Sequence, residues 1–299
     1  MKPFSLEVMN TTVYIEVSNC SIPQWHSIMD QWFHMIETEW SRFRDGNALA
    51  TLNDAEQGSI LTVSSDLYEL LKVAEQYRIY SNGRFSPYLK KAMERNGYDR
   101  SFPFYNAERY EDKPTRMKVA PIPIQFLDHN QILKSTESEI DLGGIAKGYA
   151  ADKAANWLKT IGQASYGIVD IGGDMVVWSD GRKVWKIGIE DPYDEKRELG
   201  QIQLKNGAIA TSNVVYRSWK QGDERKHHLL DGQTGLPVQS SLVQATAVTK
   251  NAVEAEVATK LCFLLQKQER DDWFKTYIPT CSRCLVKKNR TIIYEKGGE

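Results

Sequence analysis

The chain has 299 residues, of which 41% are hydrophobic and 26% are charged. This length and composition suit a soluble globular protein with a substantial core. Because 38 Lys and Arg residues balance 39 Asp and Glu residues, the formal net charge is -1. A net charge so near zero excludes a general attraction to nucleic acid or to an anionic membrane, so any basic site must be local.

The N-terminal stretch, MKPFSLEVMNTTVYIEV, alternates apolar and polar residues. It lacks the apolar core and the small-residue cleavage site of a signal peptide, and no later run of the sequence is long enough to span a bilayer. We therefore expect a cytoplasmic protein with no membrane anchor and no nucleic-acid partner.

The first part of the chain is expected to hold one strand and then several helical segments. Alternation predicts a strand over residues 7–17, and Trp, Met and Ile at helical spacing predict a helix over 22–43. A Ser or Asp cap with apolar residues at i, i+3, i+4 and i+7 predicts a second helix over 64–81. The chain then breaks at Asn82-Gly83 before it turns helical again. Residues 100–125 hold several prolines and no clear period, which predicts a loop with at most one strand.

The second part mixes strands and helices. The strand-like segment ESEIDLG leads into a predicted helix over residues 145–160. Strands are then expected in SYGIVDIGGDMVVWS, VWKIGIEDP and LGQIQLKNGAIATS, followed by a helix in KNAVEAEVATKLCFLLQ and a terminal hairpin in CLVKKNRTIIYE. Because the order lacks strict βαβ alternation, it predicts an α+β fold over residues 1–299.

The sequence contains four cysteines, and the last two, Cys281 and Cys284, form one CxxC. A single CxxC with no second pair and no well-placed histidine is a weak signal for zinc or redox chemistry. The pair is better explained by two cysteines around a turn that precedes a strand.

The segment DLGGIAKGYAAD, residues 141–152, joins a glycine pair to a lysine at the start of a predicted helix. Glycines let the backbone approach a ligand closely, and a helix that begins just after them directs N–H groups and a positive dipole end at an anion. Lys147 adds a charge. Because the segment is neither a Walker loop nor GxGxxG, a glycine turn with a solvated lysine explains it as well as a phosphate site does.

Three further segments carry polar residues beside apolar strands or helices. VDIGGDMVV predicts a tight hairpin turn at Gly172-Gly173, or one wall of a ligand groove shared with Gly143-Gly144. Thr211 and Ser212 follow an apolar strand. On the predicted C-terminal helix, Glu256 and Lys260 are spaced i and i+4, which suits a surface ion pair or the edge of a site.

The segment HHLLDGQTGLPV brings His227 and His228 close to Asp231. Adjacent side chains on a strand point to opposite faces, so at most one of the two histidines faces a given site. A histidine followed by a turn-forming Asp suits proton transfer near neutral pH. A surface histidine with a turn-capping Asp is the alternative.

Together and in this order, these segments resemble the ApbE family, the FAD:protein FMN transferases, over nearly the whole chain. MNTTVYIEV is similar to the family's Met-Gly-Thr strand with Asn10 in place of Gly, and EWSRFRDGNALATLN to its Ser-Arg-Phe/Tyr segment ending in Leu-Asn. SNGRFSPYL resembles Gly-Gly-x-Phe-Asp-Pro, DLGGIAKGYAAD is close to verbatim, IGGD and ATSN correspond well, and HHLLDGQTGLPV is similar to His-Ile-Ile-Asp-Pro-x-Thr-Gly. The resemblance implies one T-fold-related α+β domain with mixed and antiparallel sheets, flanking helices and FAD in a central groove.

The resemblance also implies a reaction. FAD would be cleaved at its pyrophosphate, FMN would be joined through a phosphoester to a Thr or Ser of a target protein, and AMP would be released. The target would carry an Asp-Gly-x-Ser/Thr-Gly-Ala-Thr-like segment, and His228 and Asp231 would be catalytic. The FAD-binding residues implied are Met9, Phe43, Phe85, Ser86, Asp141, Gly143, Gly144, Ile145, Lys147, Gly172, Gly173, Asp174, Thr211, Ser212, His228 and Lys260.

In the family a divalent ion, usually magnesium, bridges the pyrophosphate, which implies a metal site at the Ala146 carbonyl and Glu256. Here the sequence departs from the family, which has Asp where this chain has Glu256 and a ligand Thr where it has Lys260. A glutamate still suits magnesium, but a protonated lysine has no lone pair to give. Either a one-residue shift brings in Thr259, or the Lys260 ammonium takes the place of the metal. Further departures are Ser86 in place of Asp and Gly232 in place of Pro.

Two other functions stay open at this point. One is an FAD-binding protein that stores or delivers the flavin without transfer, which the lost Thr favours. The other is an FAD pyrophosphatase in which water replaces the target hydroxyl. For the isoalloxazine ring, stacking on flat rings makes Phe43, Phe85 and Tyr88 the candidates, against the alternative that all three belong to the core.

Overall fold

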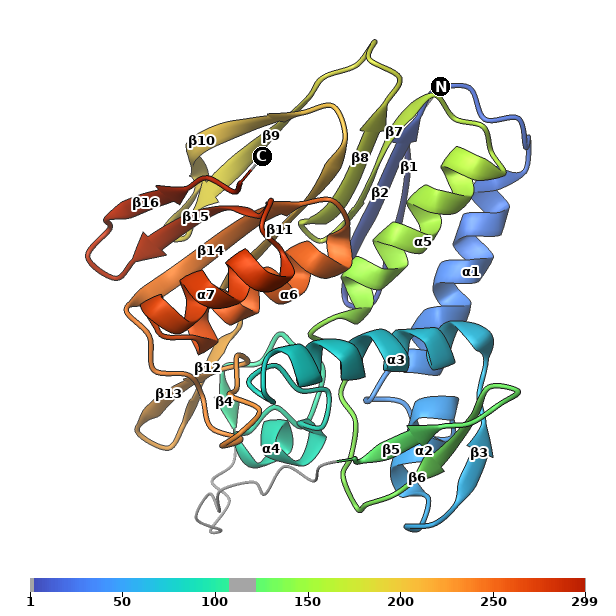
Figure 1. Ribbon diagram of the computed structural model, residues 1–299, viewed down its shortest axis with the longest axis vertical. Helices are drawn as coiled ribbons and strands as arrows, with labels where there is room; N and C mark the ends of the chain where they lie inside the picture. Colours follow the sequence, from blue (N-terminus) through green and yellow to red (C-terminus); the bar gives the residue numbers. More distant parts are fainter. Residues whose placement is uncertain (1–2, 108–121, 299) are drawn as a thin grey trace. The chain divides into compact units, whose positions relative to one another are not determined.

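The computed structural model describes residues 3–107 and 122–298 (Figure 1). It contains two compact units. Unit 1 consists of residues 1–35, 147–216 and 240–299, and unit 2 of residues 36–146 and 217–239, apart from the residues outside the described ranges. Of the loop expected over residues 100–125, residues 108–121 lie outside the described residues. The described ends of this range carry two short strands, at Asn106–Ala107 and Ile124–Phe126, where one was expected. That the chain forms a single domain stays a prediction.

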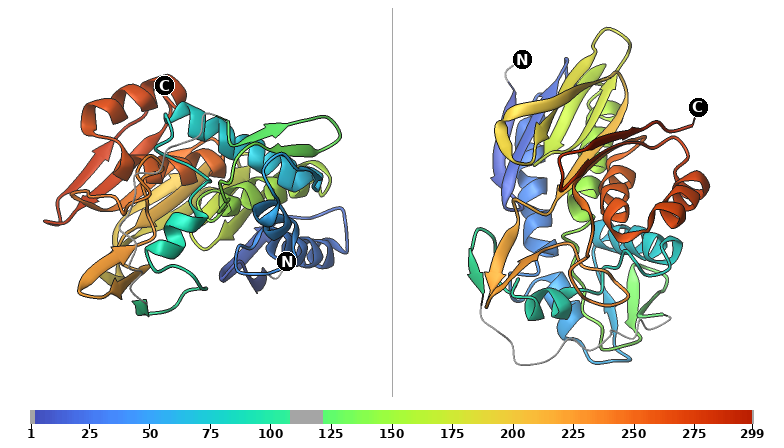
Figure 2. Two further views of the ribbon diagram at one scale, coloured as in Figure 1. Left: turned by 90° about the horizontal axis from the view of Figure 1, so that it is seen from below. Right: turned by 90° about the vertical axis from the view of Figure 1, so that its left-hand side faces the viewer.

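Unit 1 is built on an eight-stranded sheet in the order β1-β2-β7-β8-β11-β14-β15-β16. All seven neighbouring pairs in this sheet are antiparallel, and Figure 2 shows the N-terminal strands beside β7 and β8. The strands are β1 (Phe4–Val8), β2 (Thr11–Val17), β7 (Tyr166–Ile171), β8 (Asp174–Ser179), β11 (Gly207–Asn213), β14 (Leu242–Thr249), β15 (Ser282–Lys287) and β16 (Ile292–Glu295).

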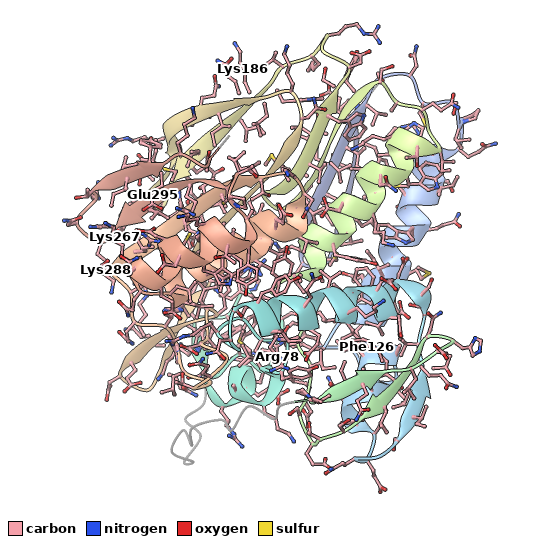
Figure 3. The ribbon with its side chains drawn as sticks, viewed as in Figure 1. Arg78, Phe126, Lys186, Lys267, Lys288 and Glu295 are labelled. Atoms are coloured by element: carbon pink, nitrogen blue, oxygen red, sulfur yellow. The ribbon has the colours of Figure 1, made fainter. Side chains whose placement is uncertain are left out.

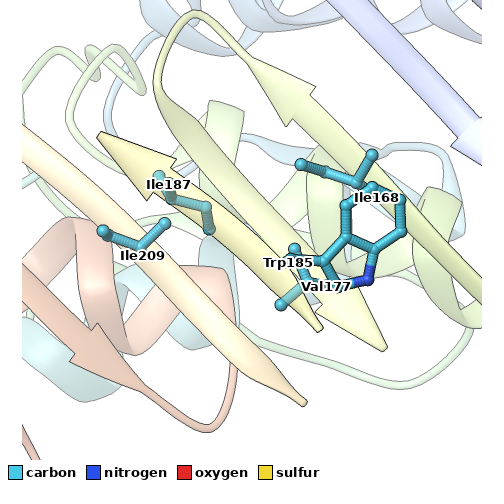
Figure 4. Close-up of a cluster of buried hydrophobic side chains, with 5 residues drawn as sticks. All are labelled: Ile168, Val177, Trp185, Ile187 and Ile209. Carbon is cyan, nitrogen blue, oxygen red and sulfur yellow. The ribbon is translucent and has the colours of Figure 1, made fainter. Parts of the chain in front are cut away.

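The two faces of this sheet are covered by different elements. Helix α6 (Ala252–Leu264) packs on β8, β11 and β14. The antiparallel ribbon of β9 (Trp185–Asp191) and β10 (Asp194–Leu204) covers the other face, where Trp185 and Ile187 pack against Ile168, Val177 and Ile209 (Figure 4). Because strand side chains alternate between faces, Ile209 faces the ribbon while its neighbours on β11 face α6.

Helix α5 (Ala146–Thr160) and helix α6 cap each other's N-termini within unit 1. The Gly148 N–H donates to Glu256 Oε2 at 2.8 Å, and the N–H groups of Ala252 and Val253 donate to the Asp152 carboxylate at 2.8 and 3.0 Å. Burial raises the pKa of Asp152 to about 6, although the two N–H groups oppose the rise. These bonds use N–H groups that a helix start leaves without intrahelical partners, so they determine where the two helices meet.

Gly148 is required for this close approach. A Cβ there would lie 2.6 Å from the Ala252 carbonyl oxygen and 3.0 Å from Glu256 Oε2. In an unstrained helix Ala is preferred to Gly by about 1 kcal/mol, but we expect Gly148→Ala to lower the free energy of unfolding by about 2 kcal/mol, because the two helices must separate. Urea unfolding measures this change. Asn156→Ala, at an exposed position of α5, is the control, and a Gly148→Ala protein as stable as this control would contradict the packing described.

Unit 2 combines short helices with two small sheets. The antiparallel sheet is β3-β6-β5, and a second sheet, β13-β12-β4, contains the parallel pair β12–β4. The elements are α2 (Ala48–Asp54), α3 (Ser65–Tyr80), α4 (Lys90–Arg95), β3 (Ile60–Thr62), β4 (Asn106–Ala107), β5 (Ile124–Phe126), β6 (Gln131–Lys134), β12 (Ser218–Gln221) and β13 (Glu224–His227). Arg78, labelled in Figure 3, forms a buried pair with Glu75 on α3.

The expected helices and the α+β class are confirmed. Helix α1 (Trp25–Trp40), α3, α5 and α6 lie within or close to the predicted ranges. Ser64 caps α3, since its hydroxyl accepts the Leu67 N–H at 3.1 Å. The terminal hairpin forms as β15 and β16, whereas α2 and α7 (Lys267–Tyr277) were not expected from the sequence.

Two predicted strands are wrong. Residues 7–17 do not form one strand, because Met9 and Asn10 have φ values of 54° and 56° and turn the chain between β1 and β2. Two left-handed residues are what a tight hairpin needs, and Asn tolerates that conformation well. The segment ESEIDLG is no strand either, because the Asn53 side chain bonds both the N–H and the carbonyl of Ile140, at 2.7 and 3.0 Å.

Candidate functional site

Four charged side chains that the sequence analysis named form one buried cluster in unit 1. The Lys147 ammonium contacts the Asp174 carboxylate and lies 3.7 Å from Glu256 Oε1. The Lys260 ammonium lies 3.2 Å from the same Oε1 atom. The exposed fractions of the four side chains are 17% for Lys147, 4% for Asp174, 1% for Glu256 and 12% for Lys260. Two ammonium groups therefore converge on one fully buried carboxylate.

The local structure of β8, α5 and α6 positions the four side chains of the cluster. Asp174 opens β8 directly after a two-residue turn in which Gly172 and Gly173 have φ values of 62° and 94°. The hairpin alternative for this glycine pair is thus confirmed, and the Asp170 carboxylate holds the turn by accepting the Gly173 N–H at 2.7 Å. Lys147 lies in the first turn of α5, while Glu256 and Lys260 are one turn apart on α6.

The four side chains of the cluster carry charges of both signs. Burial raises the pKa of Glu256, but the ammonium groups of Lys260 and Lys147 and the Gly148 N–H outweigh it, so the pKa lies below its ordinary value. Glu256 is therefore ionised at neutral pH. Counted among these four side chains alone, two carboxylates face two ammonium groups, while Lys147 also interacts electrostatically with the Asp170 carboxylate.

These residues do not fit a magnesium ion. The ammonium of Lys260 occupies the approach to Glu256 Oε1 and offers no lone pair. At about 4 Å and an effective dielectric constant of about 20, one ammonium would repel a divalent ion by roughly 8 kcal/mol.

Thr259 does not supply the missing oxygen ligand. Its hydroxyl lies 2.7 Å from the Ser212 hydroxyl and donates to the Glu256 backbone carbonyl at 2.8 Å. The side chain that reaches the Glu256 carboxylate is that of Lys260, four residues on. The Thr259 hydroxyl therefore faces Ser212 rather than the Glu256 carboxylate, and Thr259 and Ser212 hold α6 on β11.

In unit 2, Asp141 shapes the turn that precedes α5. Its carboxylate accepts the Gly143 N–H at 2.6 Å and pairs with Arg42 Nε at 2.9 Å. Arg42 lies over the rings of Phe43 and Tyr98, at 4.1 and 4.6 Å from their centroids, and its side chain is only 5% exposed. Arg42 lies in the segment EWSRF, whose sequence pattern gives no sign of this pairing.

His228 and Asp231 also lie in unit 2. His228 Nδ1 is 3.3 Å from the Arg217 carbonyl oxygen, which can only accept a hydrogen bond. This contact favours the tautomer with its proton on Nδ1, which leaves the lone pair on Nε2. Asp231 pairs with Arg84 at 2.6 Å and accepts the Gln233 N–H at 2.8 Å, so its carboxylate holds the turn after His228.

Gly232 is explained by a close approach within unit 2. A Cβ at this position would overlap the Gly83 carbonyl oxygen and the Ser86 Cβ. The Gly232 N–H also donates to the Arg84 carbonyl at 2.8 Å. Proline has no N–H to donate, so a Pro could not make this bond.

The expected flavin-contacting rings differ in exposure. Phe43 is 39% exposed, whereas Phe85 and Tyr88 are 5% and 4% exposed. The Tyr88 hydroxyl donates to Glu75 at 3.0 Å, and the Ser86 hydroxyl accepts the Tyr88 N–H at 3.1 Å. Phe85 and Tyr88 are therefore core side chains, and Phe43, whose ring lies under the Arg42 guanidinium, is the most exposed of the three.

The remaining predicted site residues are divided between the two units. In unit 1, Met9 forms the turn between β1 and β2. This turn lies beside the Gly172-Gly173 turn, since the Gly172 N–H donates to the Thr12 carbonyl at 3.2 Å. Thr211 shares a hydrogen bond of 2.9 Å with Thr246 across β11 and β14. In unit 2, Gly144, Ile145 and Ala146 continue the turn into α5, where the Ala146 N–H donates to the Leu142 carbonyl at 2.9 Å.

Comparison with known proteins decides the family. The model of the ApbE family matches residues 9–282. The chain belongs to the ApbE family. Its matched range includes every residue of the buried cluster as well as His228 and Asp231.

This ApbE family member is similar to proteins from several bacteria. The FAD:protein FMN transferase of Treponema pallidum (strain Nichols) is 25% identical over 261 residues, which are 80% of this chain and 72% of that protein. A crystal structure of an ApbE protein from Thermotoga maritima matches with a TM-score of 0.80 at 24% identity, covering 98% of this chain and 96% of the other. The flavin transferase ApbE from Vibrio cholerae matches with a TM-score of 0.78 at 18% identity, covering 99% and 97%. These structures share the α+β fold over the full length.

Two further expectations concern regions away from this cluster. Within the described ranges, no helix combines the length and the hydropathy needed to cross a membrane. Cys281 and Cys284 are free thiols, and burial raises the pKa of both. Cys284 lies opposite Tyr294 in the β15–β16 pair, so its surroundings are those of a packed strand.

Proposed function

We propose that this ApbE family member is an FAD:protein FMN transferase that moves FMN from FAD onto a Thr or Ser hydroxyl of a target protein and releases AMP. The observation that carries the proposal is the anchored Lys147. Its ammonium is held by two buried carboxylates in the first turn of α5, directly after the Gly143-Gly144 turn. A helix start with a held cation suits a phosphate compound, and the names of the similar proteins supply FAD and the reaction.

The proposed reaction is a substitution at phosphorus. The acceptor oxygen attacks the phosphorus atom on the FMN side, the P–O bond to the AMP phosphate breaks, and AMP leaves with the bridging oxygen. Positive charge from Lys147 and from the start of α5 stabilises the negative charge that builds up on the pyrophosphate. No step is assigned to a metal ion, because the residues do not fit one.

His228 is the proposed general base. With its Nδ1 proton directed at the Arg217 carbonyl, Nε2 accepts the proton of the acceptor hydroxyl as the new bond forms. Asp231 supports this role by position, because its pairing with Arg84 holds the turn that follows His228. The acceptor is expected to carry the Asp-Gly-x-Ser/Thr-Gly-Ala-Thr-like segment, and the cytoplasm is the proposed location.

The test is a comparison of nucleotide products. The purified protein is incubated with FAD alone, with FAD and a peptide bearing the acceptor segment, and with FAD and the same peptide with Ala at its Thr or Ser. A transferase releases AMP only with the hydroxyl-bearing peptide. Equal AMP and free FMN in all three tubes would identify an FAD pyrophosphatase and overturn the proposal.

A second candidate is an FAD-binding protein without transfer activity. The presence of Lys260 favours it, because its ammonium supplies less positive charge than a divalent ion at the same place would. FAD that binds tightly and stays intact in every tube would establish this function instead.

A further inference from the structure

Lys260 is the second lysine whose ammonium lies close to the Glu256 carboxylate. Its ammonium lies 3.2 Å from Glu256 Oε1 and 3.1 Å from the Glu256 backbone carbonyl oxygen. Lys147 approaches the same Oε1 to 3.7 Å. A carboxylate needs only one cation for charge balance, yet this one has two, and it also accepts the Gly148 N–H through Oε2.

The second carboxylate explains the second ammonium. Asp174 contacts Lys147, so Lys147 is shared between Asp174 and Glu256, and Lys260 completes the balance. If position 260 were threonine, the same four positions would carry one net negative charge and an additional oxygen atom beside Glu256. Such a cluster would attract a divalent cation. The four side chains as they are have neither the negative charge nor the oxygen.

We propose that Lys260 is the resident cation of this cluster, that its ammonium contacts the pyrophosphate of a bound dinucleotide, and that the protein binds no divalent ion at Glu256. The part that names the pyrophosphate rests on the proposed function. The part that excludes the metal rests on the cluster alone. A lysine makes a compact point charge with three donors, which suits phosphate oxygens.

This assignment gives different expectations for two substitutions at one position. Lys260→Thr removes the ammonium and supplies a hydroxyl oxygen, so it should create a divalent-ion site. Lys260→Met keeps a side chain of similar length and removes the charge without supplying an oxygen ligand. Lys250→Thr, at an exposed position just before α6, is the matched control.

The experiment measures the FAD dissociation constant by flavin fluorescence, in excess EDTA and in excess magnesium chloride. Wild type and Lys250→Thr should bind FAD equally in both solutions. Lys260→Thr should bind about tenfold to a hundredfold more weakly in EDTA and recover with magnesium, while Lys260→Met should be weakened in both. Weaker binding of FAD to the wild type in EDTA would overturn the proposal, as would unchanged binding to Lys260→Met. Thermal melts followed by circular dichroism show that each variant is folded.

Calorimetric titration with manganese chloride tests the metal separately from FAD. The wild type should take up no manganese at this cluster, and Lys260→Thr should take up one ion that Glu256→Gln in the same protein abolishes. Manganese uptake by the wild type that Glu256→Gln removes would contradict the proposal. If no variant bound FAD in either solution, the proposed function would be wrong, while the manganese titration would still decide whether Lys260 excludes a metal.

Discussion

Replacing His228 with Asn is expected to lower the rate of FMN transfer by about 100- to 10,000-fold, which is the usual contribution of a general base. Asn keeps a donor for the Arg217 carbonyl and removes the Nε2 lone pair. Because the chemical step is affected and FAD binding is not, kcat should fall while the FAD dissociation constant stays within about twofold. Single-turnover kinetics with the acceptor peptide measure the first quantity, and flavin fluorescence measures the second.

His227→Asn is the matched control for this prediction. The neighbouring histidine ends β13, and its Nδ1 accepts the Leu229 N–H at 3.3 Å. Because its side chain is engaged with the backbone of the following turn, transfer should continue near the wild-type rate. A His228→Asn protein that transfers FMN at the wild-type rate, or whose rate keeps the wild-type pH dependence, would remove His228 from the reaction.

Replacing Lys147 with Met is expected to affect both stability and FAD binding. The substitution leaves Asp174 buried without its ammonium partner and Glu256 with only Lys260. Breaking a buried ion pair in this way costs about 3 kcal/mol in the free energy of unfolding. FAD affinity should fall by about tenfold or more, because a charged contact to the pyrophosphate is lost. Urea unfolding and flavin fluorescence measure the two effects.

The double variant Lys147→Met, Asp174→Asn separates these effects. Removing the unpaired carboxylate should restore a large part of the stability, whereas FAD affinity should stay low. If the double variant were no more stable than the single variant, Lys147 and Asp174 would not be coupled in the folded protein. Recovery of FAD affinity in the double variant would show that Lys147 does not contact FAD.

The stability lost in Lys147→Met should also depend on pH. The pKa of Glu256 is lower in the folded protein than its ordinary value of 4.5. Stability from such a group is present above the ordinary pKa and is lost as the pH falls through the folded value. The difference in stability between wild type and Lys147→Met should therefore be largest near neutral pH and shrink below about pH 4.5, which acid titrations of the unfolding free energy can check.

Local patterns in the sequence predicted the parts of the cluster that depend on neighbours in the chain. The spacing of Glu256 and Lys260 placed them one turn apart on a helix, and the contact between them is confirmed at 3.2 Å. The surface position expected for this pair is wrong, because the Glu256 side chain is only 1% exposed. The glycine pair before Asp174 predicted the hairpin. In each case the interaction depends on backbone geometry within a few residues, which a sequence pattern reports directly.

Contacts between distant segments could not be predicted in the same way. Nothing in DLGGIAKGYAAD indicates that Lys147 contacts Asp174, or that the Gly148 N–H bonds Glu256 far along the chain. The Asn53 side chain takes up the backbone N–H and carbonyl of Ile140, which would otherwise bond to a neighbouring strand. The strand-like pattern around Ile140 therefore gives no strand. The pairing of Arg42 with Asp141 was missed because a single arginine carries no periodic signal.

The measurement that tests the central claim most directly is the mass of the acceptor peptide after incubation with the protein and FAD. Transfer predicts a mass increase equal to one FMN less one water, localised by fragmentation to the Thr or Ser of the acceptor segment. It also predicts no increase for the peptide with Ala at that position. An acceptor peptide whose mass does not change, in a solution where FAD is bound or cleaved, would contradict the assignment of this chain as a transferase.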